Sequence, residues 1–119
     1  RGLYYKKIGA DVIFVEAPKS IDEMKKIGNE IKAPLVANMI EGGATPIVSS
    51  SELHKIGFKI ILYPLSILYA NTFATLKILQ ELKNKGTTNK MKEKLVKFDQ
   101  FNEIVELSKY RKLENKYKK

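Results

Sequence analysis

The stretch ADVIFVEAP (residues 10–18) decides the fold, because an apolar run of strand length ends there directly in a carboxylate. Two further runs of the same kind follow, APLVA (residues 33–37) and FKIILY (residues 58–63). None of the three shows the strict polar and apolar alternation of a half-exposed strand. We therefore predict three buried strands, over residues 10–15, 33–37 and 58–63, in a parallel sheet.

Amphipathic stretches with readable ends separate these runs. Ser20 and Glu23 have the spacing of a capping box, which predicts a helix start, and Ser49 and Glu52 repeat the signal before a shorter helix. Gly57 is placed to end that second helix in the left-handed conformation. The first of these helices should turn one apolar face inward, made of Ile21, Met24, Ile27 and Ile31.

A longer helix is predicted over residues 66–85, with Gly86 at its end, and a lysine-rich tail should form helices over 90–96, 99–107 and 108–117. The long helix has an apolar stripe that we expect to be buried, made of Leu68, Thr72, Thr75, Leu76, Leu79 and Leu82. A second stripe, predicted to pack, is made of Tyr110, Leu113 and Tyr117.

The order of strand, loop and helix repeats every 22 to 25 residues or so, which is typical of βα units joined by right-handed crossovers. Three parallel strands alone leave both sheet edges unpaired, whereas a closed β/α barrel has eight strands and about 250 residues. The repeat therefore predicts either a piece of a barrel or a small open sheet completed by another subunit. An opening helix that begins at or before Arg1 indicates that something precedes it.

The composition excludes several kinds of site. The chain has 119 residues, no cysteine and one histidine, His54, so it contains no disulfide, thiolate metal site or cysteine nucleophile. Its net charge of +9 comes mainly from lysines mixed with acidic residues, which favours a solvated surface over a nucleic-acid site. Neither a signal peptide nor a long apolar run occurs, so we expect a soluble, cytoplasmic protein without membrane or nucleic-acid partners.

Polar side chains follow the predicted strands, where the carboxyl ends of a β/α barrel carry catalytic groups. Glu16 comes directly after the first strand, and a carboxylate there is costly to bury without a cation or strong donors. Asn38, after the second strand, can both donate to and accept from a carboxylate or carbonyl. The alternatives are an ordinary loop glutamate and a turn asparagine. The Gly42-Gly43 pair marks a turn more often than an anion-binding loop.

Several segments together resemble known motifs. GADVIFVEAP (residues 9–18) and ANMIEGGATP (residues 37–46) resemble the sixth- and seventh-strand motifs of the isocitrate lyase / phosphoenolpyruvate mutase superfamily. YPLS (residues 63–66) is similar to its eighth-strand segment, and FDQFNEIV (residues 98–105) to its C-terminal helical motif. Within the superfamily the chain looks closest to the group of methylisocitrate lyase, dimethylmalate lyase, oxaloacetate decarboxylase and carboxyphosphonoenolpyruvate mutase.

The resemblance implies the C-terminal part of a TIM (β/α)8 barrel, with strands 6–8 in residues 1–86 and a helical arm in residues 87–119. It implies a carbon-carbon lyase that uses magnesium on a small 2-hydroxy or 2-oxo dicarboxylate. The substrate-binding positions of the family match Glu16, Asn38, Met39 and Ile40. Its catalytic residues and magnesium ligands belong to earlier strands, so we expect none in this chain and no turnover by the chain alone.

The chain departs from the methylisocitrate lyase pattern at three positions. Ile40 stands where that group has a hydroxyl residue, and Tyr69 and Phe98 stand where it has substrate-binding arginines. Losing two charge-assisted contacts should weaken a tricarboxylate most, so methylisocitrate is not the expected substrate. The family also exchanges its C-terminal helices, which implies a homo-oligomer through residues 95–105. The alternative function is a non-catalytic remnant that acts as an oligomerisation or interaction module.

Overall fold

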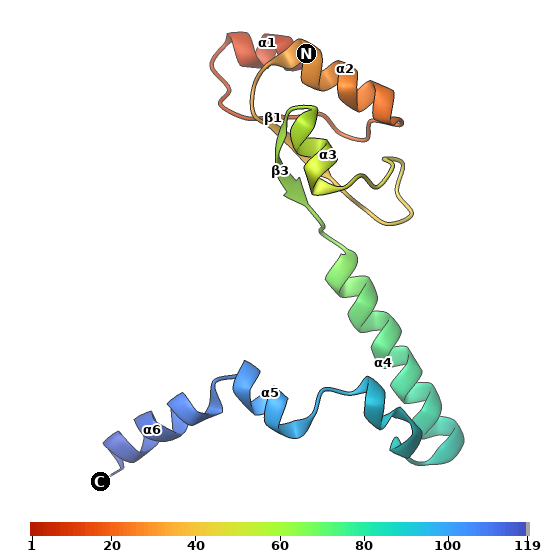
Figure 1. Ribbon diagram of the computed structural model, residues 1–119, viewed down its shortest axis with the longest axis vertical. Coiled ribbons are helices and arrows are strands. Elements are labelled where there is room, and N and C mark those ends of the chain that lie inside the picture. Colours follow the sequence, from red (N-terminus) through yellow and green to blue (C-terminus); the bar gives the residue numbers. More distant parts are fainter. Residues whose placement is uncertain (119) are drawn as a thin grey trace. The chain divides into compact units, whose positions relative to one another are not determined.

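The computed structural model describes residues 1–118 and contains a three-stranded parallel sheet in the order β1-β2-β3 (Figure 1). The predicted parallel pairing is therefore confirmed, although β1 has only two residues. The strands and the helices that connect them are β1 (Ile13–Phe14), α2 (Ile21–Ile31), β2 (Leu35–Asn38), α3 (Ser50–Lys55) and β3 (Phe58–Leu62).

The remaining elements precede and follow this sheet. They are α1 (Gly2–Lys7), α4 (Ser66–Lys85), the 3-10 helix η1 (Asn89–Lys94), α5 (Phe98–Ile104) and α6 (Leu107–Tyr117). The predicted bounds of α4 are confirmed, while the helix expected over residues 90–96 is a 3-10 turn. The chain divides into two compact units, residues 1–73 and the residues from 74 onward, so the division falls within α4. The proposed domain boundary at residue 86 stays a prediction.

The two predicted capping signals differ in their hydrogen bonds. At α3 the box is complete, because Ser49 Oγ accepts from the Glu52 N–H and Glu52 accepts from the Ser49 N–H, both at 3.3 Å. The hydrogen bonds from Ser49 hold the pKa of the Glu52 carboxyl below its usual value. At α2 the Ser20 hydroxyl accepts from the Glu23 N–H at 3.1 Å, but Glu23 reaches back to the Lys19 N–H instead of to Ser20.

The hydrophobic core lies on one face of the sheet, between the strands and the helices α2 and α3. Side chains alternate between the two faces of a strand, so Leu35, Ala37 and Met39 point to the same side. The core consists of Ile13, Met24, Ile31, Leu35, Ala37, Met39, Val48, Leu53 and Phe58. Of the four residues predicted for the inner face of α2, Met24 and Ile31 are buried, Ile27 is partly buried, and Ile21 is exposed.

The opposite face of the sheet remains open in the part of the chain that the structure describes. Phe14 on β1 and Ile60 and Leu62 on β3 are each more than 40% exposed, although they are apolar and belong to the sheet. In a closed β/α barrel this face is the packed interior, filled by side chains from all eight strands. An apolar open face is what a segment of such a barrel presents.

Two apolar stripes that the sequence predicts as buried are accessible instead. Leu68, Leu76, Leu79 and Leu82 of α4 are all exposed, and so are the three residues of the α6 stripe, Tyr110, Leu113 and Tyr117. Helical periodicity identifies which residues share a face, but burial also needs a covering element, which periodicity does not supply. Within residues 1–118, no helix has the length and apolar content needed to cross a membrane.

A close backbone contact joins α2 to the turn between α3 and β3. A Cβ atom built on Gly28 would lie 1.7 Å from the carbonyl oxygen of Ile56, far inside van der Waals contact. Gly57, the next residue, has a φ of +105°, and a Cβ built on it would lie 3.5 Å from the Gly28 Cα. Glycine at position 28 therefore allows α2 to pack directly on the backbone that leads into β3.

Replacing Gly28 with alanine should destabilise the sheet unit, because the methyl group must displace either α2 or the Ile56 carbonyl. We expect the free energy of unfolding to fall by about 1–3 kcal/mol, the usual cost of overpacking. Urea unfolding of the chain measures this change. Asn29→Ala, one residue further along α2 at an exposed position, is the control and should be neutral or slightly stabilising. Equal stability of Gly28→Ala and the parent chain would contradict the contact.

Candidate functional site

The carboxyl ends of the three strands lie at one edge of the sheet. Phe14 pairs with Val36, and Asn38 pairs with Leu62. Glu16 lies two residues past the end of β1, and Asn38 is the last residue of β2. The two predicted polar residues thus share the same end of the sheet, and the structure does not place them at opposite ends.

Glu16 is exposed and borders an open cleft of about 370 Å³. The cleft lies among the start of α1, the loop after β1 and one side of α2, which contributes Glu23, Lys26 and Glu30. Glu16 follows the first strand as expected. Because its carboxylate is exposed, it needs no cation or strong donor to offset burial in this chain.

Asn38 borders a second, much smaller cavity of about 10 Å³, which Phe14 and Thr45 also line. Its side-chain oxygen, Oδ1, is buried and has no hydrogen-bond partner among the described residues. A buried carbonyl oxygen without a partner costs about 1–3 kcal/mol. Unsatisfied polar atoms are rare in folded proteins. The side-chain oxygen of Asn38 can therefore accept a hydrogen bond from a ligand at the carboxyl edge of the sheet.

The loop after β1 lies between these two hollows and contains a strained residue. Val15, Ala17 and Pro18 line both the cleft beside Glu16 and the cavity beside Asn38. Ala17 has a φ of +51°, a left-handed conformation that non-glycine residues rarely adopt. Backbone strain of this kind gathers at functional sites, where the surrounding structure enforces it. This strain could not be predicted from the sequence, because alanine is not a turn-forming residue.

Met39 and Ile40, the other two predicted binding residues, lie in different surroundings. The Met39 side chain is fully buried in the core, and its N–H donates to the Leu62 carbonyl at 2.8 Å. Met39 also lines the small cavity beside Asn38, while Glu16 borders the separate cleft, and the binding role of Met39 stays a prediction. Ile40 is half-buried, and its carbonyl accepts from the Gly43 N–H at 3.0 Å, which closes a turn directly after the strand.

A contact that sequence reasoning missed joins the loops after β2 and β3. The Ser66 hydroxyl, at the first residue of α4, donates a hydrogen bond to the Glu41 carboxylate. This bond, with a smaller contribution from the Glu41 N–H, holds the pKa of the Glu41 carboxyl below its usual value. Glu41 and Ser66 are 25 positions apart, so only the parallel pairing of β2 and β3 reveals that they meet.

A magnesium site is not formed by the residues present. Among residues 1–118, no group of three or more histidine, cysteine or acidic side chains lies close enough together to hold a metal ion. Magnesium prefers oxygen ligands in near-octahedral geometry, and Glu16 alone does not provide such a set.

The sequence is similar to enzymes from several organisms, and no protein-family model matches it. It is 41% identical over 117 residues to 2,3-dimethylmalate lyase of Eubacterium barkeri, which is 98% of this chain and 40% of that enzyme. It is 44% identical over 113 residues to the chloroplastic carboxyvinyl-carboxyphosphonate phosphorylmutase of Arabidopsis thaliana, covering 95% of this chain and 33% of the enzyme. The chain thus spans well under half the length of these relatives.

Solved structures also match this chain. A crystal structure of 2,3-dimethylmalate lyase, described as a PEP mutase/isocitrate lyase superfamily member, matches 93% of this chain and 36% of its own with a TM-score of 0.77 and 29% identity. A phosphonopyruvate hydrolase crystallised with oxalate and magnesium has the same fold over 98% of this chain and 41% of its own, with a TM-score of 0.75 and 21% identity.

Replacing Ala17 with glycine should stabilise the chain. Relief of the left-handed strain is worth about 1–2 kcal/mol, and the greater freedom of glycine when unfolded takes back about 0.5–1 kcal/mol. We expect a net gain of roughly 0.5–1 kcal/mol in the free energy of unfolding, measured with urea. Gly9→Ala is the matched control, since Gly9 has a φ of +102° and open space around it, and it should lose stability. A loss for Ala17→Gly would argue against strain at residue 17.

Proposed function

Because the chain belongs to the isocitrate lyase / phosphoenolpyruvate mutase superfamily, we propose that it supplies part of the active-site mouth of a TIM-barrel carbon-carbon lyase. Its three strands correspond to strands 6–8 of that barrel. The substrate is a small 2-hydroxy or 2-oxo dicarboxylate. The remaining strands, which this chain does not contain, complete the pocket.

One observation carries this proposal: Asn38 stands at the carboxyl edge of the sheet with a buried side-chain oxygen that has no partner among the described residues. A carboxamide presents a donor and an acceptor side by side, which suits a hydroxy acid or its carboxylate. Glu16 lies two residues past the end of the neighbouring strand β1 and makes no ion pair in the described residues. The two side chains border separate hollows in this chain, and in this proposal they face one pocket once the remaining strands are present.

Magnesium is part of the proposed reaction, but this chain does not hold it. The residues here do not make a metal site, so its ligands are assigned to strands outside the chain. The relevant support is chemical: oxalate, a small dicarboxylate, accompanies magnesium in a structural neighbour of the same fold. Asn38 and Glu16 act in this proposal on the organic part of the substrate.

The proposed substrate has two carboxylates and no third one. Ile40 is half-buried at the strand end, where a hydroxyl residue would be needed, and it cannot donate a hydrogen bond. Tyr69 and Phe98 stand where arginines would bind a further carboxylate, and neither carries a positive charge. Because the sequence lacks these groups, a dicarboxylate such as a substituted malate is the proposed substrate, and methylisocitrate is not.

Residues 95–105, within the C-terminal arm, are proposed to bind a second copy of the protein. Their apolar side chains are accessible in the described structure, with Phe98 79% and Phe101 55% exposed. The exposed set is Leu95, Val96, Phe98, Phe101, Ile104 and Val105. A contiguous apolar surface of this kind marks an interaction site in soluble proteins. The domain-level proposal is a barrel segment in residues 1–86 and an arm in residues 87–119.

The catalytic proposal is tested in a chimera where this chain replaces the matching 117 residues of the Eubacterium barkeri lyase. We expect magnesium-dependent cleavage of 2,3-dimethylmalate by the chimera and none by the 119-residue chain alone. Asn38→Ala should lower kcat/KM of the chimera about 10- to 100-fold, the effect of losing a hydrogen bond to a charged group.

Asn29→Ala is the control for this experiment, since it makes the same chemical change on an exposed helix position. It should leave kcat/KM unchanged. A folded chimera without activity, or one that tolerates Asn38→Ala as well as Asn29→Ala, would refute the proposed role of the strand ends. Turnover by the isolated chain would refute the expectation that its pocket is incomplete.

The arm predicts concentration-dependent association of the chain in sedimentation velocity. Phe101→Asp should raise the dimer dissociation constant at least about tenfold, because burying a phenylalanine contributes roughly 1.5–3 kcal/mol. Tyr110→Asp, at an equally exposed aromatic residue of α6 outside residues 95–105, should change association much less. A monomer at all concentrations, or equal effects of the two changes, would remove residues 95–105 as the interface.

A further inference from the structure

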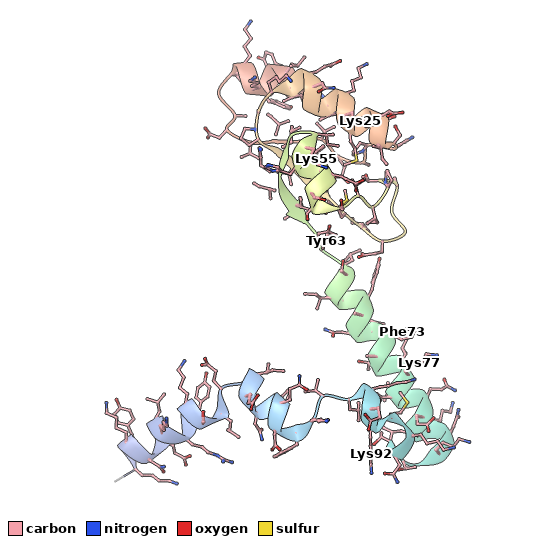
Figure 2. The ribbon with its side chains drawn as sticks, viewed as in Figure 1. Lys25, Lys55, Tyr63, Phe73, Lys77 and Lys92 are labelled. Carbon is pink, nitrogen blue, oxygen red and sulfur yellow. The ribbon has the colours of Figure 1, made fainter. Side chains whose placement is uncertain are left out.

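The loops after β2 and β3 are joined at the sheet edge by strand pairing at one end and by a side-chain hydrogen bond at the other. Asn38 and Leu62 are paired at the strand ends, and the Met39 N–H extends that pairing to the Leu62 carbonyl. The Ser66 hydroxyl, four residues beyond Leu62, donates a hydrogen bond to the carboxylate of Glu41, three residues beyond Asn38. The two strand ends and this hydrogen bond thus enclose the short segments 38–41 and 62–66. Tyr63, labelled in Figure 2, lies where the second segment leaves the sheet.

Asn38 is the first residue of the enclosed segment 38–41. Its side-chain oxygen has no partner among the described residues, so no hydrogen bond at that atom fixes the rotation of the amide group. The tight turn from Ile40 to Gly43 and the left-handed Gly42, with a φ of +76°, make the following loop a narrow one. A shift of that loop would therefore be transmitted directly to Asn38, at its base.

The contact is specific in its chemistry as well as its place. Ser66 is the first residue of α4, and a carboxylate at a helix N-terminus interacts favourably with the helix dipole. The lowered pKa of Glu41 has the direction expected when a hydroxyl donates to the ionised carboxylate. The geometry and the charge thus agree on an ionised Glu41 held by Ser66.

We propose that the Glu41–Ser66 hydrogen bond is a clasp that holds the loops after β2 and β3 together and thereby positions Asn38 for the substrate. This inference rests on the proposed function, since it assigns Glu41 and Ser66 as positioning residues for the same pocket. Neither residue needs to touch the substrate. A misplaced binding group loses substrate affinity, so loss of this exposed contact beside the strand ends should raise KM.

The clasp is tested in the chimera by steady-state kinetics. Ser66→Ala and Glu41→Ala should each raise KM about tenfold and change kcat less than about twofold, because they disturb a contact made equally in ground and transition states. Ser66→Thr keeps the hydroxyl donor and should restore KM to near the parent value. The double variant should be no worse than either single one, since each removes the same interaction. Ser108→Ala, an exposed serine of α6, is the control.

A second readout does not need turnover. In NMR spectra of the 119-residue chain, Ser66→Ala should shift the side-chain amide resonances of Asn38 and raise the pKa of Glu41 toward its usual value, while Ser66→Thr should do neither. Unchanged Asn38 resonances in Ser66→Ala, or additive effects on KM in the double variant, would overturn the clasp. A folded but inactive chimera would instead refute the proposed function, and the NMR result would still decide the clasp.

Discussion

The parallel pairing of β1, β2 and β3 is the constraint on which the rest of the structure depends. The carboxyl ends of parallel strands all lie at one edge of the sheet, so residues that are far apart in the chain come together there. Glu16 and Asn38 follow neighbouring strands at the same edge because of this pairing, and Glu41 meets Ser66 for the same reason. An antiparallel arrangement of the same segments would have dispersed every candidate residue of the site.

The same sheet explains why only one of its faces is packed. α2 and α3 cover the side that carries Leu35, Ala37 and Met39, and the Gly28 contact sets how closely α2 approaches β3. The other side presents Phe14, Ile60 and Leu62 without cover in the described residues. Apolar side chains on an open sheet face belong in the interior of a barrel. The packed core of this chain thus lies on one side of the sheet only, and the relatives that it matches are more than twice its length.

The sequence predicts the elements of this fold better than their burial. Strand-length apolar runs and serine caps located the strands and helices, and residues 66–85 form α4 as expected. The exposed leucines of α4, such as Leu76, were predicted as buried because a helical stripe records a face and not its cover. At the site, Glu16 and Asn38 follow from their place after strands. The strain at Ala17 and the Glu41–Ser66 bond do not, because backbone angles and contacts between distant residues leave no local pattern.

The central claim is that the strand ends of this chain face a substrate in one shared pocket. A crystal structure of the chimera with the Eubacterium barkeri lyase, grown with oxalate and magnesium, tests it most directly. We expect the amide of Asn38 within hydrogen-bond distance, about 3 Å, of an oxalate oxygen, and Glu16 at the rim of the same pocket. Oxalate bound with no contact to the loop after β2, or a pocket that leaves both residues outside, would contradict the account.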